Sequence, residues 1–291
     1  MSIQQLVNGL FVGSMYAVFA LGYTLVFGVL DILNLAHAAV FMAASFVALT
    51  LVEALGLSIL AALPIAMVAA GLLGLVLERI AFRPLRARAD SNIAGLISSL
   101  AMATILGAIA HELWGPNVTR FPFDTLPNAT ERLGGIVSRM QLTVIAVALV
   151  LVLALTWLVQ RTRLGRELRA VAESPRAAQV VGVNVDRAIA ASFFISSALG
   201  GAAGILYGLA YDVHVEMGRS VELKGLAVII VGGMGSMPGA VIAGIALGVI
   251  ETLVVAQLGG SFRDVVSFAG LFLILVLRPH GLLGAAATRE A

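Results

Sequence analysis

Long apolar runs recur from one end of the chain to the other, and short polar stretches separate them. An apolar run of about 18 residues is long enough to cross a membrane as a helix. The pattern therefore predicts an all-α, polytopic transmembrane bundle in which residues 1–291 form a single membrane domain. The expected spans cover about residues 7–30, a second run that ends near 52, 57–77, 92–111, 141–159, 189–209, 240–255 and 265–277.

One further apolar segment, 223–231, is only about half a span long, and the glycine-rich run 232–239 that follows it interrupts any helix. We expect about nine membrane segments with one of them short, in preference to eight. The loop 78–90 carries four arginines, which is typical of a cytoplasmic loop. Counting spans from this loop puts the N-terminus outside and the C-terminus in the cytoplasm. The charge-balanced stretch 112–139 is then an outer loop, with room for a short surface helix.

Composition narrows the class further. The chain is 60% hydrophobic and only 12% charged, with a mean hydropathy of +1.04, which excludes a soluble domain. Its apolar runs are continuous, whereas strands of a membrane barrel would alternate apolar and polar residues. Cysteine is absent, so disulfides and thiolate ligands are excluded. His, Asp and Glu show no metal-ligand spacing. We expect neither a metal nor a cofactor, and no nucleic-acid partner.

A polar stretch of 27 residues, 161–187, separates two spans and holds six arginines. Ser174 suits a helix N-cap, Pro175 the first helical position, and Gly182 the residue just past a helix end. These signals predict a short helix at about 175–181, after a helical stretch at about 166–173. One interpretation is an ordinary basic cytoplasmic loop. The other is a helix that docks a soluble motor, whose contact residues would be Arg169, Glu173, Ser174, Pro175, Arg176, Ala177, Val181 and Gly182.

Small residues recur every four positions in several spans, and such stripes allow helices to approach closely. The pattern does not identify which stripes meet. The stripes comprise Gly9, Gly13 and Ala17; Ala66, Ala70 and Gly74; Ser192, Ser196, Gly200, Gly204 and Gly208; and Ala240, Gly244, Gly248 and Thr252.

Energy coupling has no signature within the chain, because no phosphate-binding loop is present and Lys224 is the only lysine. The run 232–239, GGMGSMPG, is most simply a glycine–proline turn between two closely packed helices. Non-helical backbone at membrane depth is buried in protein or lines a wet cavity, so Gly233 and Ser236 are also candidates for the pathway or its cytoplasmic gate. An intramembrane serine protease would instead need Ser236 beside a histidine, and His37 is the only histidine expected at membrane depth.

Polar groups inside the spans supply the remaining candidates. Asp31, Asn34 and His37 are spaced by three, which would place them along one helix face. Asn34 and His37 are either a hydrogen-bonded cap or a gate. Glu251 is expected inside the membrane beside Gly244 and Gly248. It is either a structural glutamate or a functional acid, and an ATP-independent secondary transporter would use it for coupling.

Five stretches together resemble the branched-chain amino acid permeases of ABC importers. They are LNLAHAAVFM at 33–42, ERIAFRPLR at 78–86, the loop at 164–187, VGGMGSMPGAVIAG at 231–244, and FRDVVSFAGLFLILVLRPHGLLG at 262–284.

This resemblance implies a multi-pass permease of the bacterial inner membrane without an ATPase site of its own. The implied partners are a second homologous permease, two ABC ATPases on the cytoplasmic side, and a periplasmic solute-binding protein. Branched-chain amino acids are the expected solutes at family level. Importers of urea or short amides are similar and stay open as an alternative.

Overall fold

The computed structural model describes residues 3–86, 91–122, 126, 132–133, 137–278 and 281–284. Residues 87–90 of the basic loop, and 285–291 at the expected cytoplasmic C-terminus, lie outside that set. The described chain is an all-α bundle, and eight of its helices are long and apolar enough to cross a membrane. They are α1 (Ile3–Leu30), α2 (His37–Leu55), α3 (Ile59–Leu77), α4 (Ser91–Trp114), α5 (Arg139–Arg161), α8 (Val185–Ala210), α10 (Met237–Leu258) and α11 (Arg263–Leu277, preceded by the 3₁₀ turn Gly260–Phe262).

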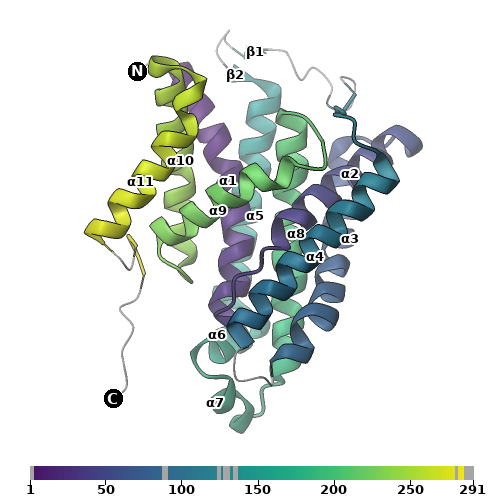
Figure 1. Ribbon diagram of the computed structural model, residues 1–291, viewed down its shortest axis with the longest axis vertical. Helices are drawn as coiled ribbons and strands as arrows, with labels where there is room; N and C mark the ends of the chain where they lie inside the picture. Colours follow the sequence, from purple (N-terminus) through teal and green to yellow (C-terminus); the bar gives the residue numbers. More distant parts are fainter. Residues whose placement is uncertain are drawn as a thin grey trace.

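The shorter elements connect these spans. A π-helical turn and a 3₁₀ turn follow α3, and the two helices of the polar loop lie at one end of the bundle (Figure 1). We call this end the loop end; the N-terminus lies at the opposite, far end. The shorter elements are η1 (Glu78–Phe82), η2 (Arg83–Leu85), α6 (Arg163–Glu173), α7 (Pro175–Val180), α9 (Met217–Gly232), and the two-residue strands β1 (Arg132–Leu133) and β2 (Val137–Ser138).

Helix α9 is the short segment that the sequence places near 223–231, but it is longer than expected. It begins at Met217, six residues before the expected start at 223, and has 16 residues. At 1.5 Å per residue it is about 24 Å long, less than the ~30 Å of a bilayer core. The sequence does not show that the charged residues at the start of α9 belong to a helix, because such residues are also typical of loops. The described chain thus has eight candidate spans, the last of which includes the 3₁₀ turn before α11, and one short segment, α9.

The polar break after α1 corrects another expectation. Asp31, Asn34 and His37 do not lie along one helix, because residues 31–36 are not helical. Asp31 has φ +54°, and the Asn34 side-chain oxygen accepts a hydrogen bond from the backbone N–H of Ala36 at 3.1 Å. A side chain that bonds its own neighbouring backbone competes with helix formation. The spacing of three therefore reflects a turn that precedes α2.

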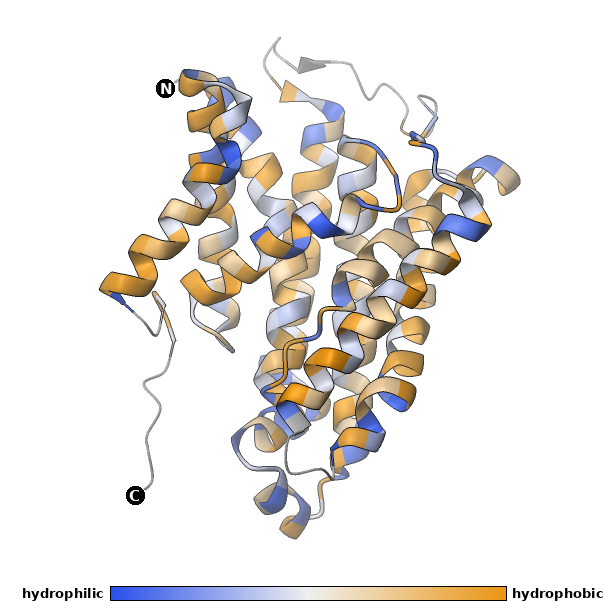
Figure 2. Cartoon of the chain, in the orientation of Figure 1, coloured by the Kyte–Doolittle hydropathy of each residue, from blue (hydrophilic) through white to orange (hydrophobic). Residues whose placement is uncertain are grey.

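Helix α1 is the centre of the bundle. Its most apolar stretch is 89% buried, against 6% for that of α11. The stripe of small residues on α1 packs against that of α10: a Cβ added to Gly13 would lie 2.7 Å from the Ile245 Cα, and one added to Gly244 would lie 2.7 Å from the Ala17 backbone nitrogen. Figure 2 shows apolar residues along the outer faces of the spans and hydrophilic ones gathered at the two ends and on α9.

The stripe on α8 packs against α1 and α2. The Ser196 hydroxyl donates to the Gly22 carbonyl at 2.6 Å. Gly200 faces the His37 ring, Gly204 lies against the Phe41 backbone, and Gly208 lies against Val213. On another face of α8, Gly201 meets Ala70 of α3. Each stripe therefore faces another helix of the same chain.

The loop after α4 has no helix in its described residues beyond Trp114, so the predicted short surface helix is not found there. Thr119 instead pairs with Val213 through two backbone hydrogen bonds of 2.9 and 2.8 Å. Arg120 hydrogen-bonds Asp212, and this contact holds the pKa of the Asp212 carboxyl below its usual value. The loop is thereby fastened to the connection between α8 and α9.

Replacing Gly204 by leucine should destabilise the protein, because the new Cβ would overlap the Phe41 carbonyl oxygen. Overpacking typically costs about 1–3 kcal/mol. We expect a lower thermal unfolding midpoint in detergent and a smaller monodisperse fraction in size-exclusion chromatography. Gly270→Leu on α11 is the control, since nothing lies within 4 Å of that Cβ position. Equal stability of the two variants would contradict the packing described for α8 and α2.

Candidate coupling surface and membrane polar sites

The two helices of the polar loop are closed at their ends by local hydrogen bonds. Thr162 caps α6, and the Ser174 hydroxyl accepts from the Ala177 N–H at 3.3 Å to cap α7. At the other end of α7, Gly182 has φ +85°, and the Val183 N–H reaches back to the Ala178 carbonyl at 2.9 Å. Together with the bond from Gly182 to Gln179 this is a Schellman motif. The predicted short helix is confirmed, with a start at Pro175 and an end within one residue.

Helix α7 lies at the loop end of the bundle (Figure 1), and it exposes apolar side chains there. Val180 and Val181 are 87% and 76% exposed, whereas Ala178 is buried. The other predicted contact residues that are exposed are Glu173, Pro175, Arg176, Ala177 and Gly182. Two adjacent exposed valines beside a charged residue form a surface that a partner protein could cover.

Helix α6 anchors α7 to the spans. Its Leu168 and Val171 are buried, and Gly165 lies directly against the last carbonyls of α5. The Arg169 guanidinium donates a hydrogen bond to the Val159 carbonyl near the end of α5. Arg169, predicted as a contact for a motor, is thus engaged with α5.

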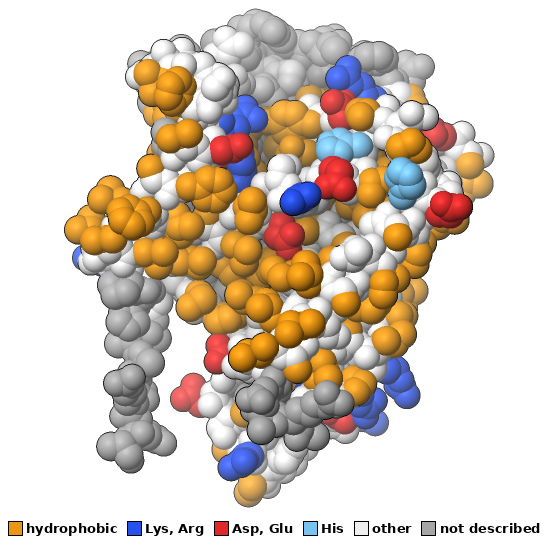
Figure 3. All heavy atoms as spheres, in the orientation of Figure 1, with side chains coloured by type: hydrophobic (Ala, Val, Ile, Leu, Met, Phe, Trp, Pro, Cys, Tyr) orange, Lys and Arg blue, Asp and Glu red, His pale blue; other side chains and the backbone are white. Residues whose placement is uncertain are grey.

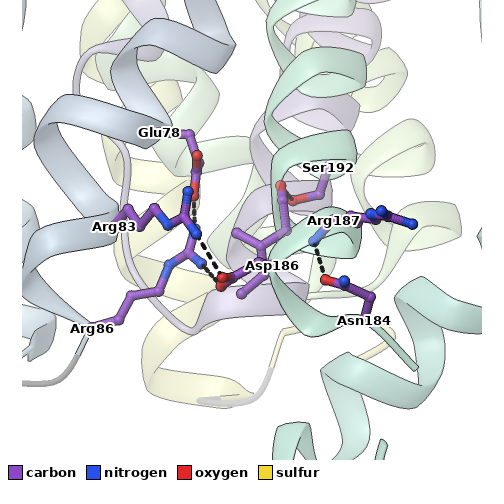
Figure 4. Close-up of polar contacts among 8 residues, drawn as sticks. Glu78, Arg83, Arg86, Asn184, Asp186, Arg187 and Ser192 are labelled. Atoms are coloured by element: carbon purple, nitrogen blue, oxygen red, sulfur yellow. Dashed lines mark hydrogen bonds and ion pairs between the residues drawn. The ribbon is translucent and has the colours of Figure 1, made fainter. Parts of the chain in front are cut away.

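A second link joins the polar loop to the loop after α3 (Figure 4). Asp186 lies in the first turn of α8 and forms two ion pairs. Its Oδ2 is 2.8 Å from Arg83 Nη2, and its Oδ1 is 3.0 Å from Arg86 Nη1. Arg86 also pairs with Glu78. Burial lowers the pKa of the Arg86 guanidinium, and the two carboxylates oppose that shift. The sequence did not predict this junction. The arginines of loop 78–90 indicated only which side of the membrane the loop occupies, and no spacing rule pairs residues about a hundred positions apart.

The glycine-rich turn between α9 and α10 lies in the same half of the bundle as α6. The Ser236 hydroxyl accepts from the Gly239 N–H at 3.2 Å and caps α10. Gly233 has φ +102°, and the backbone of residues 281–284 lies against it. A cavity of about 370 Å³ brings Ser236 together with Arg169, Thr24 and Gly28. The structure therefore unites one pathway candidate with one predicted coupling residue.

His37 is fully buried between the rings of Phe19 and Tyr23, at centroid distances of 4.8 and 5.3 Å. Its Nε2 lies 3.3 Å from the Phe19 carbonyl oxygen, and its Nδ1 has no partner among the described residues. His37 touches α1 at Gly22, whereas Ser236 belongs to the turn that approaches α1 at Gly28. These levels differ by about 9 Å of helix rise. Ser236 and His37 are too far apart for the protease alternative.

Glu251 is buried in a polar cluster that joins four helices. Tyr16 donates to its Oε2 at 3.0 Å, and Ser267 donates to its Oε1 at 2.6 Å. Lys224 Nζ lies 2.9 Å from Oε1 and also 3.2 Å from Asp264. The sequence did not identify these partners. A usable signal existed, because the only lysine of the chain and the only acid of span 240–255 both fall in apolar segments. No three His, Asp or Glu side chains of the described residues form a possible metal site.

These features define a class: a multi-pass membrane protein whose helices enclose polar groups and which carries a capped helix at one end. The family model described as "branched-chain amino acid transport system / permease component" matches residues 5–277. The chain belongs to that family, as a permease component of a transport system.

Three relatives illustrate the family. The high-affinity branched-chain amino acid transport system permease protein BraD of Pseudomonas aeruginosa is 36% identical over 97% of this chain and 95% of its own. The corresponding protein LivH of Escherichia coli K12 is 35% identical, with the same coverage. The autoinducer 2 import system permease protein LsrC of Klebsiella pneumoniae is 33% identical over 49% of this chain and 43% of its own.

The pair Lys224–Glu251 should show strong energetic coupling. Lys224→Met removes the cation nearest the buried Glu251 carboxylate and leaves, among the described residues, only Arg263, whose Nε lies 4.0 Å from Oε2. Breaking a buried pair typically costs about 3–5 kcal/mol. Adding Glu251→Gln removes the stranded charge, so the double variant should be more stable than Lys224→Met alone. Thermal unfolding of the four proteins in detergent gives the comparison. If the losses of thermal stability in the two single variants add up in the double variant, Lys224 and Glu251 do not interact.

Proposed function

We propose that this chain is one permease of an ATP-driven importer in which soluble ATPases grip helix α7. The observation that carries the proposal is α7 itself: a helix closed at both ends, with Val180 and Val181 exposed, at the tip of the bundle. The chain has no phosphate-binding loop, so the energy would come from a partner. A second permease and a periplasmic solute-binding protein would complete the transporter.

The loop end is the cytoplasmic side in this proposal, which leaves the N-terminus in the periplasm and the C-terminus in the cytoplasm. Arginines in loops between spans are retained on the cytoplasmic side. Those near the loop end are Arg79, Arg83, Arg86, Arg161, Arg163, Arg166, Arg169, Arg176 and Arg187. ATPases in the cytoplasm would then meet α7 directly.

Movement of α7 would enter the bundle at two points. Through α6 it reaches the end of α5, where Arg169 holds the Val159 carbonyl. Through Asp186 it reaches Arg83 and Arg86, and with them the end of α3. The cavity between α6 and the Ser236 turn lies beside the first of these links, and non-helical backbone at membrane depth is tolerated where it lines a wet cavity. We infer that the cytoplasmic gate is at this turn, with Gly233 and Ser236 in its wall.

Branched-chain amino acids are the proposed solutes, on the basis of what BraD and LivH are named for and their similarity over nearly the whole chain. Urea or a short amide is the alternative within the same mechanism, and competition of unlabelled solutes against leucine uptake separates the two. An ATP-independent carrier that uses Glu251 is less well supported, because both carboxylate oxygens of Glu251 already have partners.

Val180→Asp should uncouple ATP hydrolysis from uptake, since it places a charge in the apolar contact without disturbing the fold of an exposed position. Pro175→Gly should act in the same direction, because it loosens the first turn of α7 by roughly 1 kcal/mol. For either variant of the complete transporter in proteoliposomes, we expect leucine uptake to fall at least about tenfold relative to ATP hydrolysis.

The matched control is Val118→Asp, a valine 62% exposed at the far end. It should transport like the parent protein. Normal uptake by both α7 variants would remove α7 from the coupling mechanism. Uptake of leucine by the purified chain without ATPases would overturn the importer proposal as a whole.

A further inference from the structure

A hollow of about 610 Å³ lies between α2, α4 and α9, on the face of the molecule shown in Figure 3. Acidic, basic and histidine side chains gather on this face around α9, amid apolar ones. Neither the coupling surface nor the Lys224–Glu251 cluster contributes a residue to the hollow. Its volume falls within the range of about 300–1,000 Å³ that small-molecule sites occupy.

The hollow extends from the middle of the bundle toward the far end. Along α4 its wall runs from Leu100 to His111, which is about 16 Å of helix rise, roughly half of a bilayer core. Across from α4, Gly218 of α9 packs directly on Ala38 of α2, the residue after the buried His37. In the proposed orientation the hollow therefore opens toward the periplasm and ends at mid-membrane depth.

The walls of the hollow differ in chemistry. Helices α2 and α4 supply a mostly apolar wall, which includes Ala38, Met42, Leu100 and Ala103. Thr104 and His111 are the polar residues that α4 adds to it. Helix α9 supplies the charged wall. A solute that fits both walls carries an aliphatic group at one end and charges at the other.

Glu222 is the unexplained group of the charged wall. Its Oε1 is buried and has no hydrogen-bond partner among the described residues. Arg219 stands one turn away on the same helix, 83% exposed at its side chain, and its nearest carboxylate partner is Glu216 at the long distance of 3.8 Å. A carboxylate within a membrane segment does not face lipid tails, and a buried polar atom without a partner requires an explanation.

We propose that this hollow is a solute-binding site of the permease itself, in which Glu222 receives the α-ammonium group of an amino acid. Arg219 faces the α-carboxylate, and the wall formed by Ala38, Met42, Leu100 and Ala103 takes the aliphatic side chain. The inference rests on the proposed function, because it places within this chain a recognition step for the solute that the binding protein releases. An ammonium–carboxylate contact is a charge-assisted hydrogen bond, among the stronger polar interactions.

The test is leucine import by the complete transporter in proteoliposomes, driven by saturating leucine-loaded binding protein. Glu222→Gln keeps the shape of the side chain and removes its charge. We expect the leucine imported per ATP hydrolysed to fall about tenfold or more. Glu53→Gln, the same substitution at an exposed position at the end of α2, should import like the parent protein. Ala103→Phe fills the apolar wall and should also lower import.

Import by Glu222→Gln and Ala103→Phe at the parent rate would overturn the site, whatever the solute. If the parent transporter imports urea or a short amide but not leucine, the proposed solute is wrong. A neutral solute carries no ammonium group for Glu222 to bind. If Glu222→Gln then imports that solute at the parent rate, the ammonium site is rejected as well. The two proposals thus fail on different measurements.

Discussion

Close approach of backbones along α1 is the constraint on which the rest of the bundle depends. In a membrane the hydrophobic effect does not drive helices together, so association relies on van der Waals packing and hydrogen bonds. Gly13 and Gly244 let α1 and α10 meet backbone to backbone, and the Ser196–Gly22 hydrogen bond joins α8 to α1. With α1 enclosed on several sides, the peripheral helices α4 and α11 keep most of their apolar surface exposed.

An enclosed α1 also explains why charges can exist inside this protein. Tyr16 of α1 supplies a hydroxyl to Glu251, and Lys224 neutralises that carboxylate from α9. A buried pair contributes little net stability relative to apolar residues, but either partner alone is costly. Lys224 and Glu251 therefore fix how α9 and α10 sit on α1. Glu222 differs from them, since it has a buried oxygen that no described residue satisfies.

The features that the sequence predicted correctly depend on local chemistry. Helix α7 was located from Ser174, Pro175 and Gly182 because capping signals act within a few residues. The stripes of small residues were visible by their period, but their pairing was not, because spacing along one helix carries no information about its neighbour. The break at Asp31 was misassigned for another reason: a spacing of three fits a helix face, but it also fits a turn in which Asn34 accepts a hydrogen bond from the Ala36 N–H. The start of α9 was missed because the polar residues there resemble a loop until the hollow beside them is known.

The ion pairs of Asp186 matter for the positions of the helix ends and add little to the stability of the protein. Surface ion pairs typically contribute about 0–1 kcal/mol, and Asp186 and Arg83 are both about half exposed at their side chains, at 56% and 44%. The junction fixes the relative position of two helices: two arginines on one carboxylate hold the end of α3 against the start of α8. A capped α7 that moved alone would only rotate about its own loop. Since α6 is seated on α5 and α8 is tied to α3, the proposed coupling predicts that a displacement of α7 moves the ends of these spans together.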